Sequence, residues 1–301
     1  MGIAGLALAW RFAAHEFHTA LWISDGIGIV ALVVFGLLSI AYLGKILKHP
    51  EAVKTEFNHP IAGNFFGTFN IALMLLSSVI ASFSLPASEV VWTIGSLGAL
   101  ALAFISISRL LKGQVDSGHA LPAWLIPGVA TLDITATGAT MPMAWARELN
   151  LLALAVGTIV GLVFFTMIVS RLIHHQEKLA GGMVPSLMIL IGPFAVGFLA
   201  YTNFTRQIDG FAAMLFYFGL FLFLTLVFKV FLRSIPFATG WWAIGFPLAA
   251  LSIATLKYAA AVQLWPLTWL AVALLAFLSI VIAVLFYRTL RIILNGSLLR
   301  A

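Results

Sequence analysis

The sequence predicts an all-α membrane protein from its composition and from the continuity of its apolar segments. Of its 301 residues, 62% are hydrophobic and 9% are charged, and the mean hydropathy is +1.11. A soluble domain has roughly 45–50% apolar and about 25% charged residues. The apolar segments run unbroken for about 20 residues, which suits a membrane-spanning helix and not the alternating pattern of a β-barrel. We expect a single membrane domain over residues 1–301.

Ten segments mark the predicted membrane spans, because charged side chains cost several kcal/mol at the bilayer centre. They are Gly2–Leu21, Gly26–Gly44, Pro60–Phe83, Val90–Ser108, Leu121–Thr140, Asn150–Ser170, Pro185–Tyr201, Phe211–Phe228, Gly240–Leu256 and Thr268–Tyr287. Two spans carry charge. The fifth holds Asp133, and the first turns polar at Arg11 and Glu16, a half that we place at the outer surface. The joins are short, so no second domain is expected.

The distribution of Lys and Arg predicts the orientation. Twelve lie in joins that follow the even-numbered spans: Lys45, Lys48, Lys54, Arg109, Lys112, Arg171, Lys178, Lys229, Arg233, Arg288, Arg291 and Arg300. The opposite side has only Arg11, Arg147, Arg206 and Lys257. Basic loops favour the cytoplasm, so both termini are expected there and the spans form five hairpins. Because the net charge of +6 is dispersed over helix ends, it does not indicate nucleic-acid binding.

Proline divides the spans into two kinds. Pro127, Pro193 and Pro247 lie inside the fifth, seventh and ninth spans, whereas the even-numbered spans have no interior proline. An interior proline removes a backbone hydrogen bond and kinks the helix, and the freed carbonyl needs another partner. Membrane helices also use proline freely, which is the alternative. The alternation by hairpin favours an inner ring of odd-numbered helices around a central path.

The sequence offers few groups for catalysis. It has no cysteine, no phosphate-binding glycine loop and neither a G-x-S-x-G nor an H-E-x-x-H motif. We therefore expect no enzyme activity, metal or cofactor. His15 and His18 could share a helix face, but no further ligand is in view, and an interfacial polar turn is the simpler interpretation. His174 and His175 fit a solvated cytoplasmic loop.

Two ionisable residues and one aromatic residue invite functional hypotheses. Asp133 lies about 16 Å beyond Pro122 along a helix, near the bilayer midplane. A protonated carboxyl hydrogen-bonded to a neighbouring helix is slightly preferred over a role in proton coupling or permeation. Lys257, near the outer end of the ninth span, is either interfacial or an anion-attracting group at a mouth. Phe246 precedes Pro247, and composition alone favours packing over a gate.

Several strings together resemble one family. Gly240-Trp-Trp-Ala-Ile-Gly-Phe-Pro-Leu and Ser252-Ile-Ala-Thr-Leu-Lys-Tyr-Ala resemble the ninth helix of the slow anion channel and tellurite-resistance/dicarboxylate transporter family. The resemblance continues, in the same order, in Asn58-His59-Pro60 with Asn64-Phe65-Phe66, in Leu125-Ile126-Pro127-Gly128 and in Gly192-Pro193-Phe194. It covers nearly the whole chain.

The resemblance implies ten helices in five hairpins with quasi-five-fold symmetry, odd-numbered helices that line a central pore, and a homotrimer. It also implies a bacterial inner-membrane location and a pore plugged by a phenylalanine of the ninth helix, here Phe246. We expect Lys257 to attract anions at the mouth. The expected pore-lining residues are Pro127, Pro193, Pro247, Phe65, Phe66, Phe194 and Asp133.

The chain departs from the family in three places. It begins a turn or two inside the family's first helix. Phe69 and Asn70 stand where relatives tend to have a proline, and Ala62 stands where they often have an arginine. A cytoplasmic anion-attracting residue is therefore expected to be missing.

The first functional hypothesis is a gated channel for small monovalent anions such as chloride or nitrate. Its path would select by diameter and general positive potential. The alternative is a proton-coupled transporter of a dicarboxylate or an oxo-anion of the tellurite or sulfite type, with Asp133 as the titratable group. A membrane-embedded enzyme is the least favoured class.

Overall fold

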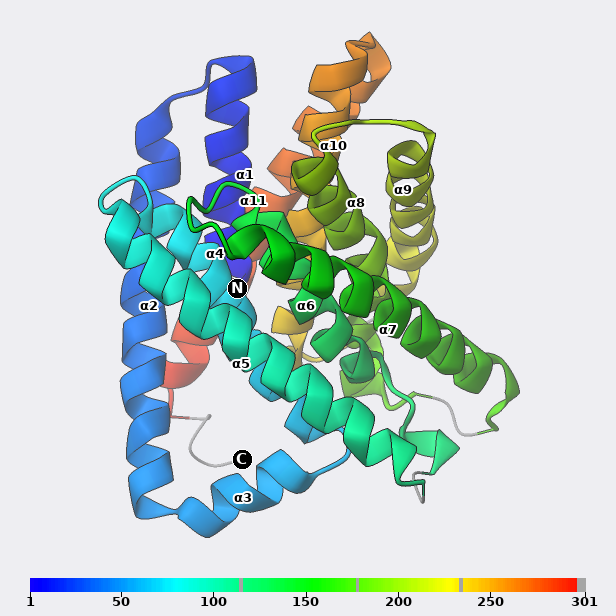
Figure 1. Ribbon diagram of the computed structural model, residues 1–301. Coiled ribbons are helices and arrows are strands. Elements are labelled where there is room, and N and C mark those ends of the chain that lie inside the picture. Colours follow the sequence, from blue (N-terminus) through cyan, green and yellow to red (C-terminus); the bar gives the residue numbers. More distant parts are fainter. Residues whose placement is uncertain (114–115, 177–178, 233–234, 297–301) are drawn as a thin grey trace.

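The protein is built of helices. The computed structural model describes residues 1–113, 116–176, 179–232 and 235–296, and within these ranges it holds eleven α-helices, five 3₁₀ segments and no strand (Figure 1). The predicted all-α class is confirmed. Three of the basic residues used to predict the orientation, Lys178, Arg233 and Arg300, lie outside the described residues.

The helices follow one another with short connections. The α-helices are α1 (Gly2–Phe17), α2 (Leu21–Lys48), α3 (Pro50–Asn58), α4 (Gly67–Ile80), α5 (Leu85–Leu111), α6 (Leu125–Gly138), α7 (Ala146–His174), α8 (Gly192–Thr205), α9 (Gly210–Phe231), α10 (Gly245–Val262) and α11 (Trp265–Leu294). The 3₁₀ segments are η1 (Ala62–Phe66), η2 (Ser117–His119), η3 (Pro122–Trp124), η4 (Gly181–Ile191) and η5 (Thr239–Ile244).

Eight helical stretches of the described chain are long and apolar enough to cross a membrane, so this is a multi-pass membrane protein. They correspond to all the predicted spans except the first and the fifth. In those two places α1 has 16 residues and α6 has 14, fewer than the roughly 20 that a helix needs to cross the hydrocarbon core alone.

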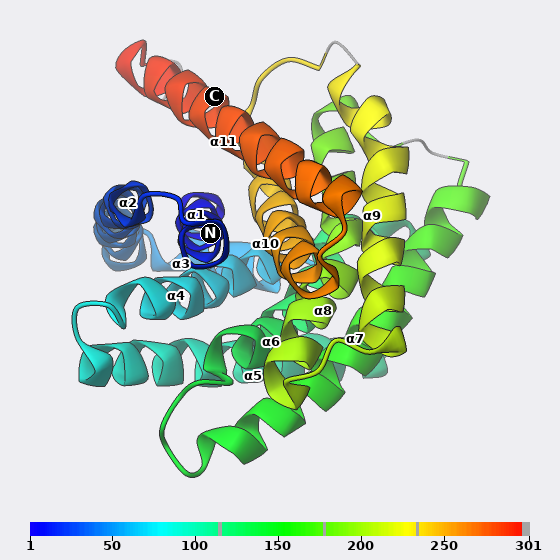
Figure 2. The same ribbon diagram turned by 90° about the horizontal axis from the view of Figure 1, so that it is seen from above.

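The helices pack as consecutive pairs whose first members also touch one another. The pairs are α1 with α2, α4 with α5, α6 with α7, α8 with α9 and α10 with α11. In addition, α1, α4, α6, α8 and α10 contact each other in a closed cycle, because α10 packs against α1. Figure 2 shows the second member of each pair toward the outside.

Burial distinguishes the first members of the pairs from the second members. We call the first members the inner helices (α1, α4, α6, α8 and α10) and the second members the outer helices (α2, α5, α7, α9 and α11). In the membrane-crossing window of Gly181–Thr205, which contains α8, 89% of residues are buried, against 11% in that of α2 and 28% in those of α7 and α9. The outer helices expose large apolar side chains, such as Leu37 and Phe221. Apolar surface of this extent outside a closed bundle suits contact with lipid.

The three prolines lie inside continuous helical stretches, just after a change of helix type. Each of η1, η3, η4 and η5 ends one residue before α4, α6, α8 or α10 begins. Pro127, Pro193 and Pro247 are the third, second and third residues of their α-helices. Proline is tolerated in a first turn, where backbone N–H groups lack regular α-helical partners. In α4, which follows η1 in the same way, the third residue is Phe69. A change from 3₁₀ to α helix therefore does not require proline.

The short helix α3 was not predicted; its residues were assigned to a loop. Pro50 stands at its first position and Glu51 lies in its first turn, both favourable at a helix start. Glu56 accepts hydrogen bonds from Lys45 and Tyr42 of α2, and the bond from Lys45 contributes most to lowering the pKa of Glu56. These contacts fasten α3 to the last turns of α2. It lies at the bottom of Figure 1.

The end of the bundle at which the outer helices finish carries most of the basic residues. Those described there are Lys45, Lys48, Lys54, Arg109, Lys112, Arg171, Lys229, Arg288 and Arg291. We call it the basic end. It is also the end at which η1, η3, η4 and η5 lead into the inner helices.

Candidate functional site

A cavity of about 290 Å³ lies among the starts of the inner helices. Its wall is formed mainly by η1 and α4 (Phe65, Thr68, Ile71), α6 (Ile126, Val129), η4 (Met183, Ser186, Ile189) and η5 with α10 (Trp242, Phe246, Pro247). None of the described side chains that line it is charged. We call this space the inner cavity. It is apolar, with a few hydroxyl groups in its wall.

Phe246 forms part of that wall and is itself 6% exposed. It is the second residue of α10, directly after the change from η5. Glycines set how close α10 comes to α1: a Cβ added at Gly2 would lie 3.4 Å from the Cα of Gly245, and one at Gly5 would lie 2.6 Å from the Cβ of Ala249. This close approach fixes the start of α10, and with it Phe246.

The other predicted aromatic residues divide between two environments. Phe65 lines the inner cavity. Phe66 instead contacts Phe57 and Tyr42 with its ring, at centroid distances of 5.2 and 6.1 Å. Adjacent residues of the 3₁₀ segment therefore face opposite ways, one toward the cavity and one toward α2 and α3.

Phe194 packs toward the outer helices. Its ring centroid lies 5.0 Å from that of Phe165 of α7 and 4.5 Å from that of Phe218 of α9. Neither Phe194 nor the prolines Pro127 and Pro193 line the inner cavity. Among the three prolines, only Pro247 does so.

Asp133 lies deeper in the bundle, on the same side of α6 as the cavity wall. It follows Ile126 by seven residues, and at about 100° per residue the two share one helix face, about 10 Å apart along the axis. Asp133 is 2% exposed, and its Oδ2 is buried without a hydrogen-bond partner in the described chain. The expected hydrogen bond between helices is therefore not present at this oxygen.

Lys257 lies on the face of α10 that carries Phe246. The separation of eleven residues is close to three full turns, so the two side chains point the same way about 16 Å apart along the axis. The ammonium group donates hydrogen bonds to Thr202 Oγ1, at 2.9 Å, and to Asn203 Oδ1. Asn203 Nδ2 in turn donates to the carbonyl of Ala136, at 2.6 Å. The network joins α10, α8 and α6 at the end opposite the basic end.

Arg206 adds a second positive charge to this network. It follows the last residue of α8, and its Nη2 donates to the carbonyl of Ala139 at 3.1 Å. The ion pairs of the described residues join Arg11 to Asp25 and Lys45 to Glu56, so neither Lys257 nor Arg206 is neutralised by a carboxylate there. Sequence reasoning missed Thr202 and Asn203, because the predicted seventh span ended just before them. Two polar residues after an apolar span were the available signal.

No metal centre accompanies these groups in the part of the chain that the structure describes, where no three His, Asp or Glu side chains gather closely enough to hold an ion. The arrangement can instead guide an anion. It combines a cavity that no charged side chain of the described residues lines with two cations, Lys257 and Arg206, at the opposite end of the bundle.

A multi-pass helical bundle that encloses such a cavity is typical of membrane channels and transporters. Residues 1–290 match the SLAC1 family, described as voltage-dependent anion channel. The chain belongs to this family, as its resemblance indicated.

The relatives of the chain include plant and bacterial proteins. The chain is 27% identical to the S-type anion channel SLAH3 of Arabidopsis thaliana, over 96% of this chain and 46% of the relative. It is 27% identical to the guard cell S-type anion channel SLAC1 of the same plant, over 95% of this chain and 52% of the relative. A tellurite resistance protein TehA homolog of Haemophilus influenzae is also 27% identical, over 84% of this chain and 76% of the relative. The chain spans about half the length of these plant relatives.

Proposed function

We propose that the protein is a gated channel that passes small monovalent anions, such as chloride and nitrate, along a path enclosed by α1, α4, α6, α8 and α10. One observation carries the proposal: Phe246, in the wall of the inner cavity that no charged side chain of the described residues lines, and the unneutralised Lys257 share one face of α10. The two plant relatives named as anion channels support the same activity. Five hairpins with quasi-five-fold symmetry would make this path the axis of each subunit of a homotrimer.

The lining of the path explains both conduction and gating. No charged side chain of the described wall lines the inner cavity, so an anion meets no side-chain ion that would hold it there. An aromatic ring in the path offers little to replace the water that the ion sheds, which raises a barrier of several kcal/mol. Phe246 is the proposed plug. Phe65 and Pro247 line the same cavity, whereas Pro127, Pro193, Phe66 and Phe194 support its walls from behind.

The orientation follows from charge. The basic end is proposed to face the cytoplasm, with both chain termini on that side, because Lys and Arg favour cytoplasmic loops. Lys257 and Arg206 then lie at the outer mouth, where they concentrate anions. A bacterial inner membrane is the proposed location.

The test is the electrical behaviour of the full chain reconstituted in a planar bilayer. We expect currents that far exceed the turnover of a carrier and a reversal potential that follows the chloride or nitrate gradient. A pH gradient should leave that potential unchanged. Flux that is slow and requires a pH gradient would contradict the channel.

A proton-coupled transporter of a dicarboxylate or an oxo-anion is the second candidate, because Asp133 shares the cavity face of α6 and leaves one buried oxygen without a partner. Such a group could carry a proton along the path. The Haemophilus influenzae relative, named for tellurite resistance, fits an oxo-anion substrate.

A further inference from the structure

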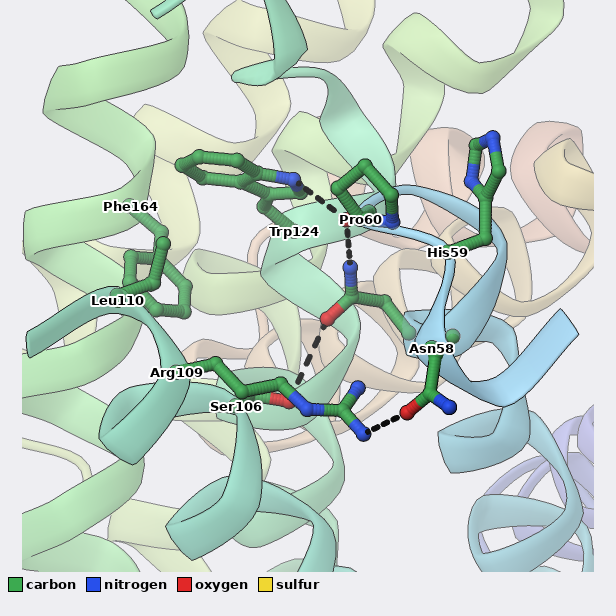
Figure 3. Close-up of a pocket in the computed structure, with 10 residues that line it drawn as sticks. Asn58, His59, Pro60, Ser106, Arg109, Leu110, Trp124 and Phe164 are labelled. Atoms are coloured by element: carbon green, nitrogen blue, oxygen red, sulfur yellow. Dashed lines mark hydrogen bonds between the residues drawn. The ribbon is translucent and has the colours of Figure 1, made fainter. Parts of the chain in front are cut away.

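A second cavity, of about 180 Å³, lies at the basic end, on the outer side of η1. Figure 3 shows its walls, which come from the end of α3 and the residues that follow it, from η1, from the last turns of α5, from η3 and from α7. The lining includes Asn58, Asn64, Ser106, Arg109, Leu110 and Phe164. We call it the peripheral cavity. Asn64 and Phe65 are chain neighbours that line different cavities, so this space lies outside the proposed anion path.

Arg109 is the fixed positive charge of the peripheral cavity. Its Nη1 donates to the carbonyl of Phe57 at 2.8 Å and its Nη2 donates to Asn58 Oδ1 at 3.0 Å. The guanidinium also lies 4.7 Å from the centre of the Phe57 ring. A guanidinium has five N–H groups, so these bonds orient it and leave others for a ligand. None of the ion pairs in the described chain includes it.

The remaining polar groups surround this charge without neutralising it. Asn64 Nδ2 donates to the carbonyl of Pro60 at 3.0 Å, and the hydroxyl of Ser106 lies 3.5 Å from Asn64 Oδ1. At that distance the Ser106 hydroxyl is weakly engaged and can turn to a better acceptor. The described lining contains no carboxylate. Arg109 is its permanently charged residue, and His59 is its other ionisable side chain, whose Nδ1 accepts hydrogen bonds from the backbone N–H groups of Ile61 and Ala62.

The other side of the cavity is apolar. Leu110, Trp124 and Phe164 line it. Arg109 and Leu110 belong to the last turn of the membrane-crossing helix α5, in which Leu111 is 82% exposed. A cation beside apolar side chains at the end of a spanning helix stands at the depth of lipid head groups.

We propose that the peripheral cavity binds the phosphodiester of an anionic membrane phospholipid. Arg109 gives charge-assisted hydrogen bonds to the phosphate oxygens, the Ser106 hydroxyl donates another, and the acyl chains run along α5 beside Leu110. The permanent positive charge of Arg109 matches the single negative charge of a phosphodiester. A zwitterionic lipid brings a second cation close to Arg109 and is disfavoured.

The binding test uses the full chain in detergent and follows its thermal unfolding by tryptophan fluorescence. Mixed micelles with phosphatidylglycerol are compared with micelles containing phosphatidylcholine and with inorganic phosphate alone. We expect saturable stabilisation by phosphatidylglycerol and at least about a tenfold weaker response to the other two. Equal stabilisation by phosphatidylcholine would overturn the proposal. Equal stabilisation by inorganic phosphate would also overturn it, in favour of a free anion.

Variants locate the site. Arg109→Gln removes the charge and should weaken the phosphatidylglycerol response at least tenfold. Because it also removes bonds that hold Phe57 and Asn58, Ser106→Leu serves as a second variant that fills the cavity and leaves Arg109 intact. Lys112→Gln is the matched control, since Lys112 follows α5 but does not line the cavity. If both Arg109→Gln and Ser106→Leu are stabilised by phosphatidylglycerol as strongly as the wild type, the proposed site is wrong. It is also wrong if Lys112→Gln alone loses this stabilisation.

Discussion

Phe246 and Lys257 lie on the same face of α10, eleven residues and about 16 Å apart. One forms part of the wall of the inner cavity, and the other is fixed by Thr202 and Asn203 at the opposite end of the bundle. A single helix therefore carries the proposed plug and the proposed anion-attracting mouth. This geometry allows each to be tested separately.

Replacing Phe246 by alanine should raise the anion conductance at least about tenfold, since each 1.4 kcal/mol removed from a barrier speeds passage about that much. Phe246→Leu should have a smaller effect because much of the obstruction remains. Phe194→Ala is the control: Phe194 packs between Phe165 and Phe218, so its loss should lower stability without opening the path. Single-channel recordings decide. An alanine variant that folds, assembles and conducts like the parent would mean that Phe246 is packing.

Removing the charge of Lys257 should reduce the current most strongly at low salt. Lys257→Met keeps the apolar stem and deletes the cation, so the local anion concentration falls. Raising the salt from about 0.01 to 1 M shortens the Debye length from about 30 to 3 Å and should narrow the difference from the parent. Arg147→Gln, an exposed cation at the same end, is the control and should change little. A reduction that is independent of salt would contradict electrostatic attraction.

Asp133→Asn separates the two candidate functions. The variant keeps the shape of the side chain but cannot exchange a proton. A channel should retain its anion conductance, or increase it slightly, because the asparagine cannot present a negative charge on the cavity face of α6. A coupled transporter should lose all proton-linked uptake, measured in liposomes with a pH gradient. Loss of conductance in a folded protein would favour the transporter.

Hydropathy predicted the outer helices well because each of them is one long apolar segment that ends in basic residues. The inner helices were harder: α-helical and 3₁₀ segments bury similar side chains, so no pattern distinguished η4 (Gly181–Ile191) from α8. The helix α3 was overlooked because its polar residues resemble a loop, although Pro50 and Glu51 are a start signal.

The candidate site depended on information beyond composition. Phe246 was singled out by resemblance, since a phenylalanine in an apolar helix has no signature of its own. The directions of Phe66 and Phe194 could not be read from their spacing, because tertiary packing turns their rings toward outer elements. Lys257 and Asn203 meet across 54 residues of sequence. Such a contact follows from the packing of α8 against α10.

Gly157 should be intolerant of larger residues. A Cβ at this position of α7 would lie 2.7 Å from Leu132 Cγ and 2.8 Å from the backbone nitrogen of Leu132. Gly157→Val must therefore force α6 and α7 apart, at a cost of about 1–3 kcal/mol. Gly36→Ala is the control, because nothing lies within 4 Å of its added Cβ. Thermal unfolding in detergent should show a lower Tm for the first variant and an unchanged or higher one for the second.

Asp209 should stabilise the start of α9 in a pH-dependent way. Its Oδ2 accepts a hydrogen bond from the Tyr201 hydroxyl at 2.6 Å, and its Oδ1 accepts one from the Ala212 N–H at 3.0 Å. These bonds favour the ionised carboxylate, the first of them most, and lower the pKa of Asp209. A carboxyl group whose pKa is lower in the folded protein stabilises the fold fully at pH values above its ordinary pKa of about 3.9. This stabilisation is lost as the pH falls through the lower pKa of the folded state.

Asp209→Ala should therefore have a lower Tm than the parent at pH 7. The difference should shrink as the pH falls below about 4, because the unfolded parent takes up the proton there and the folded carboxylate does so only at a lower pH. Tyr201→Phe removes only one of the two donors and should give a smaller change in the same direction. The measurement is thermal unfolding of the three proteins in one detergent between pH 7 and pH 3. A difference between parent and Asp209→Ala that stays constant over this range would mean that the carboxylate charge does not contribute to the cap.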